Sequence, residues 1–147
     1  MIILLATGGY IGKSPVAPGT LGTLWGLPIA CALDHTPWGI DLLATALLTA
    51  VAIWSAGRCA DLMGIKDPGA VVIDEVAGMV VTLLGLPFTV ATACWGFVLF
   101  RLLDIAKPYP IGWLDRHLKG GLGIVADDVA AGVIANLTLR LILIWVA

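Results

Sequence analysis

The chain has 147 residues, of which 60% are hydrophobic and 12% are charged, and its formal net charge is −2. A typical soluble domain has about 25% charged residues, so this composition predicts an integral or closely membrane-associated protein. The sequence has no basic stripe that could neutralise phosphates at the density of a nucleic acid, which argues against a nucleic-acid partner. The length fits a single domain over residues 1–147. We expect no cleaved signal peptide, because the first residues lack a basic leader.

Glycine and proline divide the chain into apolar blocks of helical length, without the alternating pattern of strands. We therefore expect an all-α protein that folds as a compact multi-helix bundle. Predicted helices cover residues 20–33, 40–63, a third segment that starts near Asp67 and Pro68 and ends before GLPF, 89–107, and 124–145. A short amphipathic helix, IGWLDRHLKG, precedes the last one.

The number of membrane crossings is open at this stage. The apolar blocks 42–57, 76–86 and 89–100 are each shorter than the roughly 20 residues that an upright membrane helix needs. Residues 76–100 read either as one membrane helix or as a hairpin or kink, because Gly-Leu-Pro lies near their middle. If the segments fold back as hairpins, most cations gather on one side, which the positive-inside rule assigns to the cytoplasm.

Three charged residues recur along one face of the predicted helix 89–107. Arg101, Asp104 and Lys107 are spaced i, i+3 and i+6, just before the prolines of KPYP. One interpretation is an interfacial ladder of ion pairs, and the other is a functional site in which two cations flank a carboxylate.

Two acidic residues, Asp127 and Asp128, lie near the start of the last predicted helix. The positive end of the helix dipole favours anions there, so capping explains one of them more readily than two. Asp128, Gly132 and Asn136 are spaced i, i+4 and i+8, and this narrow face suits close packing against another helix.

Carboxylates at the ends of apolar helices are the main candidates for chemistry. They are Asp74, Glu75, Asp104, Asp127 and Asp128. Mutual repulsion opposes such a cluster unless a divalent cation neutralises it, and oxygen-only ligands favour Mg²⁺. No close Cys/His spacing indicates zinc, and we expect the three cysteines to be reduced core thiols. Adjacent helix positions point about 100° apart, so we expect one member of each acidic pair to face the site and the other to cap or support it.

The loop GKSPVAPGTLGTL has the ingredients of an anion site before a helix N-terminus, with Lys13 and the hydroxyls of Ser14, Thr20 and Thr23. The alternative is a plain connection with an exposed lysine. His35 and His117 are lone histidines, which we expect to be structural or solvated.

Four segments, taken in order, resemble the phosphatidylglycerophosphatase A family: GKSPVAPGTLGTL, VVIDEVAGM, FRLLDIAKPYPIGWLDR and KGGLGIVADDVAAG. The resemblance implies a Mg²⁺-dependent enzyme of the bacterial inner membrane that hydrolyses phosphatidylglycerol phosphate to phosphatidylglycerol and inorganic phosphate. The family's acidic motifs map to Asp74, Glu75, Asp104, Asp127 and Asp128 as catalytic and metal-binding residues. Its RxxDxxKP motif adds Arg101 and Lys107, and its Pro-Gly-Thr turn adds Thr20. Together with Ser14 and Lys13, these are the expected phosphate-binding residues.

Direct attack by water is the preferred mechanism, because the sequence lacks the Cys-x5-Arg, Asp-x-Asp and paired-histidine signatures of covalent phosphatases. An aspartyl-phosphate intermediate is the alternative. A different class remains open as well, a small helical membrane transporter or cation-binding protein with intramembrane carboxylates. A transporter needs charges spread across the bilayer depth, whereas a lipid phosphatase needs them at one surface.

Overall fold

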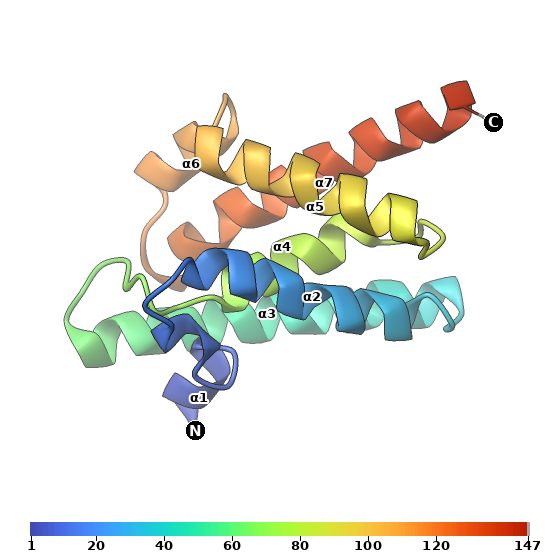
Figure 1. Cartoon of the computed structure of the whole chain (residues 1–147). Coiled ribbons are helices and arrows are strands. Elements are labelled where there is room, and N and C mark those ends of the chain that lie inside the picture. Colours follow the sequence, from blue (N-terminus) through green and yellow to red (C-terminus); the bar gives the residue numbers. More distant parts are fainter. Residues whose placement is uncertain (147) are drawn as a thin grey trace.

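A computed structural model describes residues 1–146, whose regular structure is entirely helical (Figure 1). This confirms the all-α prediction. The elements are α1 (Ile2–Ala6), the short 3-10 helix η1 (Ile11–Lys13), α2 (Pro18–Leu33), α3 (Trp38–Met63), α4 (Ile73–Leu83), α5 (Val90–Ala106), α6 (Ile111–His117) and α7 (Gly120–Val146).

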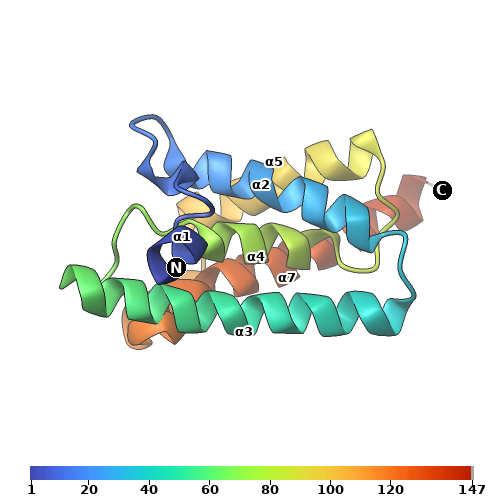
Figure 2. The same cartoon turned by 90° about the horizontal axis from the view of Figure 1, so that it is seen from below.

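Helix α4 is the centre of the bundle. It packs against α2, α3, α5 and α7, and almost every one of its residues is buried (Figure 2). Because each face of α4 meets another helix, the helix is apolar all round beyond its first turn, apart from the buried Thr82. That first turn carries Asp74 and Glu75, so the bundle places two carboxylates at the end of its most buried helix.

Close approach of α7 to α4 depends on small residues. A Cβ added at Gly132 would lie 2.5 Å from the carbonyl oxygen of Gly78, which leaves no room for a side chain. One turn further on, Asn136 donates from Nδ2 to the carbonyl oxygen of Thr82 at 2.9 Å. The predicted packing face of the last helix is therefore confirmed, and it holds Asp128 beside the start of α4.

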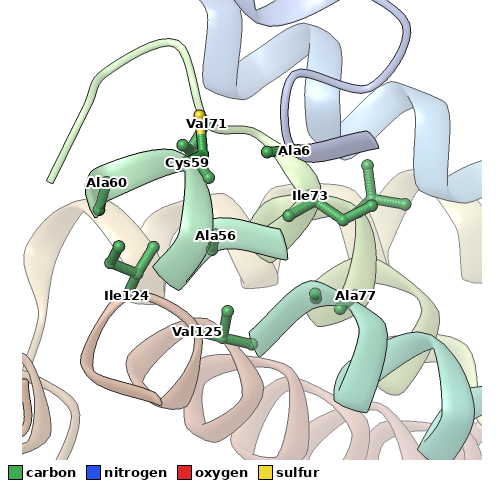
Figure 3. Close-up of a cluster of buried hydrophobic side chains, with 11 residues drawn as sticks. Ala6, Ala56, Cys59, Ala60, Val71, Ile73, Ala77, Ile124 and Val125 are labelled. Carbon is green, nitrogen blue, oxygen red and sulfur yellow. The ribbon is translucent and has the colours of Figure 1, made fainter. Parts of the chain in front are cut away.

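An apolar cluster joins α1, α3, α4 and α7 next to the acidic helix ends. Figure 3 shows side chains of the four helices meeting in it, among them Ala6, Cys59, Ile73 and Val125. Ile73 and Val125 are close in sequence to Asp74 and Asp127, respectively. Burial of the apolar neighbours thus fixes the positions of the polar residues beside them.

Two helices begin at different residues from those predicted. Helix α4 begins at Ile73 rather than near Pro68, because residues 68–71 form a turn, in which Val71 N–H donates to the carbonyl oxygen of Pro68 at 2.8 Å, and Val72 N–H donates to the carbonyl oxygen of Ala6 at 2.9 Å. Helix α7 begins at Gly120 rather than near Ile124. A Cβ at Gly121 would collide with the carbonyl oxygen of Ile53 on α3. The glycines of GGLG therefore lie within α7 and allow it to pack closely against α3.

The Gly-Leu-Pro sequence separates α4 from α5 and forms the turn of a helical hairpin. Gly85 adopts a left-handed conformation there with a φ of +62°. Residues 76–100 are therefore two helices and not a single membrane helix. Within the described residues, two helices are long and apolar enough to cross a bilayer, Trp38–Met63 and Gly120–Trp145, each with 26 residues.

Candidate active site

The polar ends of several helices meet at one end of the bundle, on the left in Figures 1 and 2. The starts of α2, α4 and α7 and the end of α5 surround a cavity of about 370 Å³, which α6 and the loop before α4 complete. Most of the predicted site residues line it, namely Thr20, Asp74, Glu75, Arg101, Asp104, Lys107, Asp127 and Asp128.

Both members of each adjacent acidic pair reach this cavity. The structure therefore differs from the expectation that only one member of each pair faces the site while the other caps or supports it, both for Asp74 and Glu75 and for Asp127 and Asp128. The reason is that the cavity extends around the ends of α4 and α7, so side chains that leave a helix in different directions still border it.

The carboxylates form two groups that share one residue. In the first, single oxygens of Asp74, Glu75 and Asp128 lie within 4.8 Å of one another. In the second, the same holds for Asp104, Asp127 and Asp128. Oxygens at these separations have the spacing of ligands around one hard cation, and Asp128 belongs to both groups.

Several carboxylate oxygens in the cavity are buried without a hydrogen-bond donor among the described residues. They are Oδ1 of Asp74, Oε2 of Glu75 and Oδ1 of Asp127. A buried carboxylate oxygen without a partner is costly, and a proton, a cation or an ordered water can satisfy it. The donor set consists of oxygens alone, which fits Mg²⁺.

Burial has a clear electrostatic effect at the start of α4. Burial, and then the neighbouring charge of Glu75, raise the pKa of Asp74 well above its usual range. Burial also raises the pKa of Glu75. Without a compensating positive charge these groups favour their protonated forms, and a bound cation opposes that tendency.

Arg101 connects the ends of α4 and α5. Its Nη1 donates to Oδ2 of Asp104 at 2.6 Å and lies 3.9 Å from Oε1 of Glu75. The predicted ion-pair ladder is therefore present between Arg101 and Asp104. It does not continue to Lys107, because that residue ends α5 in a left-handed conformation with a φ of 43° and leaves the helix face.

Lys107 instead bridges α6 and α7. Its Nζ donates to Oδ1 of Asp115 at 2.9 Å and to Oδ2 of Asp127 at 2.7 Å. Although burial favours the neutral amine, these hydrogen bonds raise the pKa of Lys107 above its usual value. Asp115 was not identified from the sequence as a site residue. Its position inside the family-like segment FRLLDIAKPYPIGWLDR was the only signal in the sequence that could have indicated it.

The predicted anion loop is divided between two places. Thr20 lines the cavity, whereas Lys13 and Ser14 lie outside its lining and border a second depression. The hydroxyl of Thr23 is buried and donates to the carbonyl oxygen of Gly19 at 2.9 Å, which is a structural role. His117 stacks on Trp113, 4.6 Å between ring centroids, in agreement with the expectation of a structural histidine.

Buried carboxylates beside an arginine and a lysine, at one end of a helical bundle, define a helical enzyme of the phosphoryl-transfer class. Comparison with known proteins agrees. Residues 4–143 match the family described as Phosphatidylglycerophosphatase A. The chain therefore belongs to the phosphatidylglycerophosphatase A family and is a phosphatase.

Individual relatives cover most of the chain. It is 42% identical to phosphatidylglycerophosphatase A of Escherichia coli (strain K12), over 90% of this chain and 77% of that protein. It is 35% identical to phosphatidylglycerophosphatase A of Haemophilus influenzae, over 98% and 90%. A Bacteroides thetaiotaomicron protein with the provisional name phosphatidylinositol-3-phosphatase is 38% identical, over 89% and 86%. No solved structure matches this chain.

Proposed function

We propose that this enzyme is a Mg²⁺-dependent phosphomonoesterase of phospholipid biosynthesis that hydrolyses phosphatidylglycerol phosphate to phosphatidylglycerol and inorganic phosphate. The observation that carries the proposal is one cavity in which buried and half-buried carboxylates from α4, α5 and α7 converge beside Arg101 and Lys107. The names of two relatives support the choice of substrate.

The residues that would hold Mg²⁺ are Asp74, Glu75, Asp104, Asp127 and Asp128. The unpartnered oxygens of three of them support this assignment. When bound, Mg²⁺ supplies positive charge that draws electron density from the phosphoryl group and opposes repulsion between the phosphate and the carboxylates.

The cations of the cavity suit the terminal phosphate of the substrate. Lys107 has three N–H donors, of which two are used by Asp115 and Asp127, so one remains for a phosphate oxygen. Arg101 uses Nη1 for Asp104 and keeps further donors of its guanidinium group. The hydroxyl of Thr20 and the free amides of the first turn of α2 add neutral donors.

Attack by water is the step that these groups would assist. The water oxygen forms a bond to phosphorus and the bond from phosphorus to the glycerol oxygen breaks. A carboxylate of the cavity takes up the proton of the water, and the leaving glycerol oxygen gains a proton in exchange, so that phosphatidylglycerol leaves as an alcohol. Because the substrate phosphate is held between Arg101 and Lys107, negative charge on its oxygens is stabilised as the bonds change. With a terminal phosphorothioate made chiral by oxygen-18 and hydrolysed in oxygen-17 water, inversion of configuration at phosphorus is expected, and retention would indicate an aspartyl-phosphate intermediate instead.

A position in the bacterial inner membrane, with the cavity facing the cytoplasm, completes the proposal. Helices α3 and α7 have the length and composition of membrane helices. Large apolar side chains are exposed on the outer faces of the bundle, for example Leu43, Trp95, Leu102, Leu137 and Ile144. The acidic cavity lies at one end of these helices, where a lipid headgroup would reach it. This location favours a lipid phosphatase over a transporter, for which carboxylates would line a path across the bilayer.

The test is phosphate release by the purified protein from phosphatidylglycerol phosphate in detergent micelles. We expect activity with Mg²⁺, no activity with excess chelator, and recovery when Mg²⁺ is returned. Phosphatidylinositol 3-phosphate is the comparison substrate, and we expect slower release from it. Activity that persists without a divalent cation would refute the role of the metal.

The matched variants are Asp104→Asn and Asp61→Asn. Asp104 lines the cavity, whereas Asp61 is an exposed aspartate on α3 outside it. We expect Asp104→Asn to lower kcat/KM by at least about 100-fold, because it removes a charged group from the reaction site. Asp61→Asn is expected to retain activity, and equal activity in the two variants would refute the assignment of the site.

A further inference from the structure

A second depression lies beside the acidic cavity and has a different character. It is about 450 Å³ in volume and lined by Tyr10, Ile11, Lys13, Ser14, Leu21, Leu24 and Trp25. Apolar side chains form most of this lining, and Lys13 is its single charged residue. We call this depression the α2 groove, because three of its residues lie on the outer face of α2.

The backbone before α2 is shaped to form this groove. Tyr10 adopts a left-handed conformation with a φ of 72°, which is unfavourable for a tyrosine. The hydroxyl oxygen of Thr7 accepts a hydrogen bond from Tyr10 N–H at 3.1 Å and holds the turn. As a result the ring of Tyr10 lies beside the ammonium group of Lys13, with 4.7 Å from Nζ to the ring centroid.

The α2 groove and the acidic cavity share a wall. Thr20 lines the cavity and the next residue, Leu21, lines the groove, so their Cα atoms are only about 3.8 Å apart. In the loop before α2, Ser14 lines the groove and Ala17, three residues later, lines the cavity. One extended molecule can therefore occupy both depressions across the first turn of α2.

We propose that the α2 groove binds the rest of the same lipid substrate, with the phosphodiester at Lys13 and the start of an acyl chain against Leu24 and Trp25. This inference rests on the proposed function. The substrate has a terminal phosphate, a glycerol linker, an anionic phosphodiester and acyl chains, in that order. The protein presents matching features in the same order. The acidic cavity would take the terminal phosphate, the shared wall the glycerol linker, Lys13 the phosphodiester, and the apolar side chains of the α2 groove an acyl chain.

Charge complementarity supports binding of the anionic phosphodiester at Lys13. No acidic residue lines the α2 groove, so the ammonium group has no carboxylate partner there and is free to meet an anion. Trp25 and Leu24 are half exposed on the outer face of α2, which suits contact with a hydrocarbon chain at the membrane surface. Selectivity for a lipid over a soluble phosphate ester would then reside in the groove and not in the acidic cavity.

The experiment compares three substrates that share the terminal phosphate. Phosphatidylglycerol phosphate in mixed micelles has the diester and acyl chains, its deacylated form has the diester alone, and glycerol 3-phosphate has neither. The variants are Lys13→Ala, Lys13→Arg and Trp25→Ala. Their matched controls are Arg116→Ala, an exposed cation outside both depressions, and Trp54→Ala, which is 48% exposed on α3 against 51% for Trp25.

For Lys13→Ala we expect kcat/KM for both diester-containing substrates to fall about tenfold relative to glycerol 3-phosphate, mainly through KM. Lys13→Arg should restore most of the loss. For Trp25→Ala we expect a loss of about fivefold to tenfold with the full lipid only. If glycerol 3-phosphate is not turned over, its inhibition constant against the lipid gives the same comparison.

The results separate this inference from the proposed function. If the unmodified enzyme releases no phosphate from the lipid, the proposed function fails. If the enzyme is active and Lys13→Ala and Trp25→Ala behave like Arg116→Ala and Trp54→Ala, the α2 groove is not a substrate site. An equal loss by Lys13→Ala on all three substrates would instead place Lys13 at the terminal phosphate, and would overturn this inference.

Discussion

At the scale of single residues, Gly19 is a small residue that borders two side chains of the site. It lies in the first turn of α2, where a Cβ would collide with Oε1 of Glu75 and lie 3.3 Å from Nη1 of Arg101. The glycine of the Pro-Gly-Thr sequence therefore leaves space for a carboxylate and a guanidinium group of the site. A side chain at this position would push Glu75 away from the other carboxylates.

Gly19→Ala is accordingly expected to reduce phosphatase activity more than it reduces stability. The exposed Gly39, which has no atom within 4 Å of an added Cβ, provides the control. Gly39→Ala should leave activity intact and increase stability slightly, by up to about 1 kcal/mol, because alanine restricts the unfolded chain. Activity and the midpoint of thermal unfolding would be measured for both variants, and full activity of Gly19→Ala would contradict this role.

At the scale of elements, the turn between α4 and α5 is held by the helices on either side. Nη2 of Arg140 on α7 donates to the carbonyl oxygen of Leu84 at 2.8 Å. From α3, Oδ2 of Asp41 accepts a hydrogen bond from Gly85 N–H at 3.3 Å. Asn136 completes the set with bonds to the carbonyl oxygens of Thr82 and Leu84. Both α4 and α5 carry site residues at their other ends, so this turn fixes their relative position.

Loss of one of these bonds should destabilise the bundle. Asn136→Ala removes the side-chain donor to two carbonyl oxygens and the acceptor of Arg140 Nε, so we expect a cost of about 1–3 kcal/mol. Thr138→Ala on the same helix removes only a bond to its own helix, at Ile134, and should cost less. Thermal unfolding in detergent would compare the two, and equal midpoints would argue against the role of Asn136.

At the scale of the whole molecule, polarity is arranged along the helix axes. The acidic cavity, α6 and the loop before α4 lie at one end, and the turns from α2 to α3 and from α4 to α5 lie at the other (Figure 1). Between the ends, the outer faces expose large apolar side chains. A bilayer across the middle would cover those faces and leave the cavity at one surface.

This arrangement predicts which chain segments are on the same side of the membrane. In a variant with the three native cysteines replaced, Ile65→Cys marks the cavity end and His35→Cys marks the other end of α3, and both positions are exposed. In spheroplasts of a bacterial host, a membrane-impermeant maleimide should label His35→Cys directly and Ile65→Cys only after the membrane is opened. The reverse pattern would refute the cytoplasmic orientation, and labelling of both from outside would refute a membrane-spanning α3.

The sequence by itself determined the helical class, the approximate extent of the main helices and most of the charged residues around the cavity. These are local properties, since composition, apolar block length and short motifs depend on neighbouring residues. The sequence also indicated the packing face of Asp128, Gly132 and Asn136. Their i, i+4 and i+8 spacing places them on one face of a single helix, whatever that helix packs against. The start of α7 was predicted too late, because the glycines of GGLG indicate a break before a helix. In the structure the same glycines lie within α7, where they allow close contact with α3.

Only the tertiary structure decided which of these residues meet. Lys107 and Asp127 are separated by 20 positions, and their contact depends on how α5 and α7 pack around α4. The same packing made Asp128 common to both carboxylate groups, brought Asp115 to Lys107, and left Lys13 in a separate groove. Such distances are set by the burial of apolar faces between helices, and no local pattern in the chain specifies them.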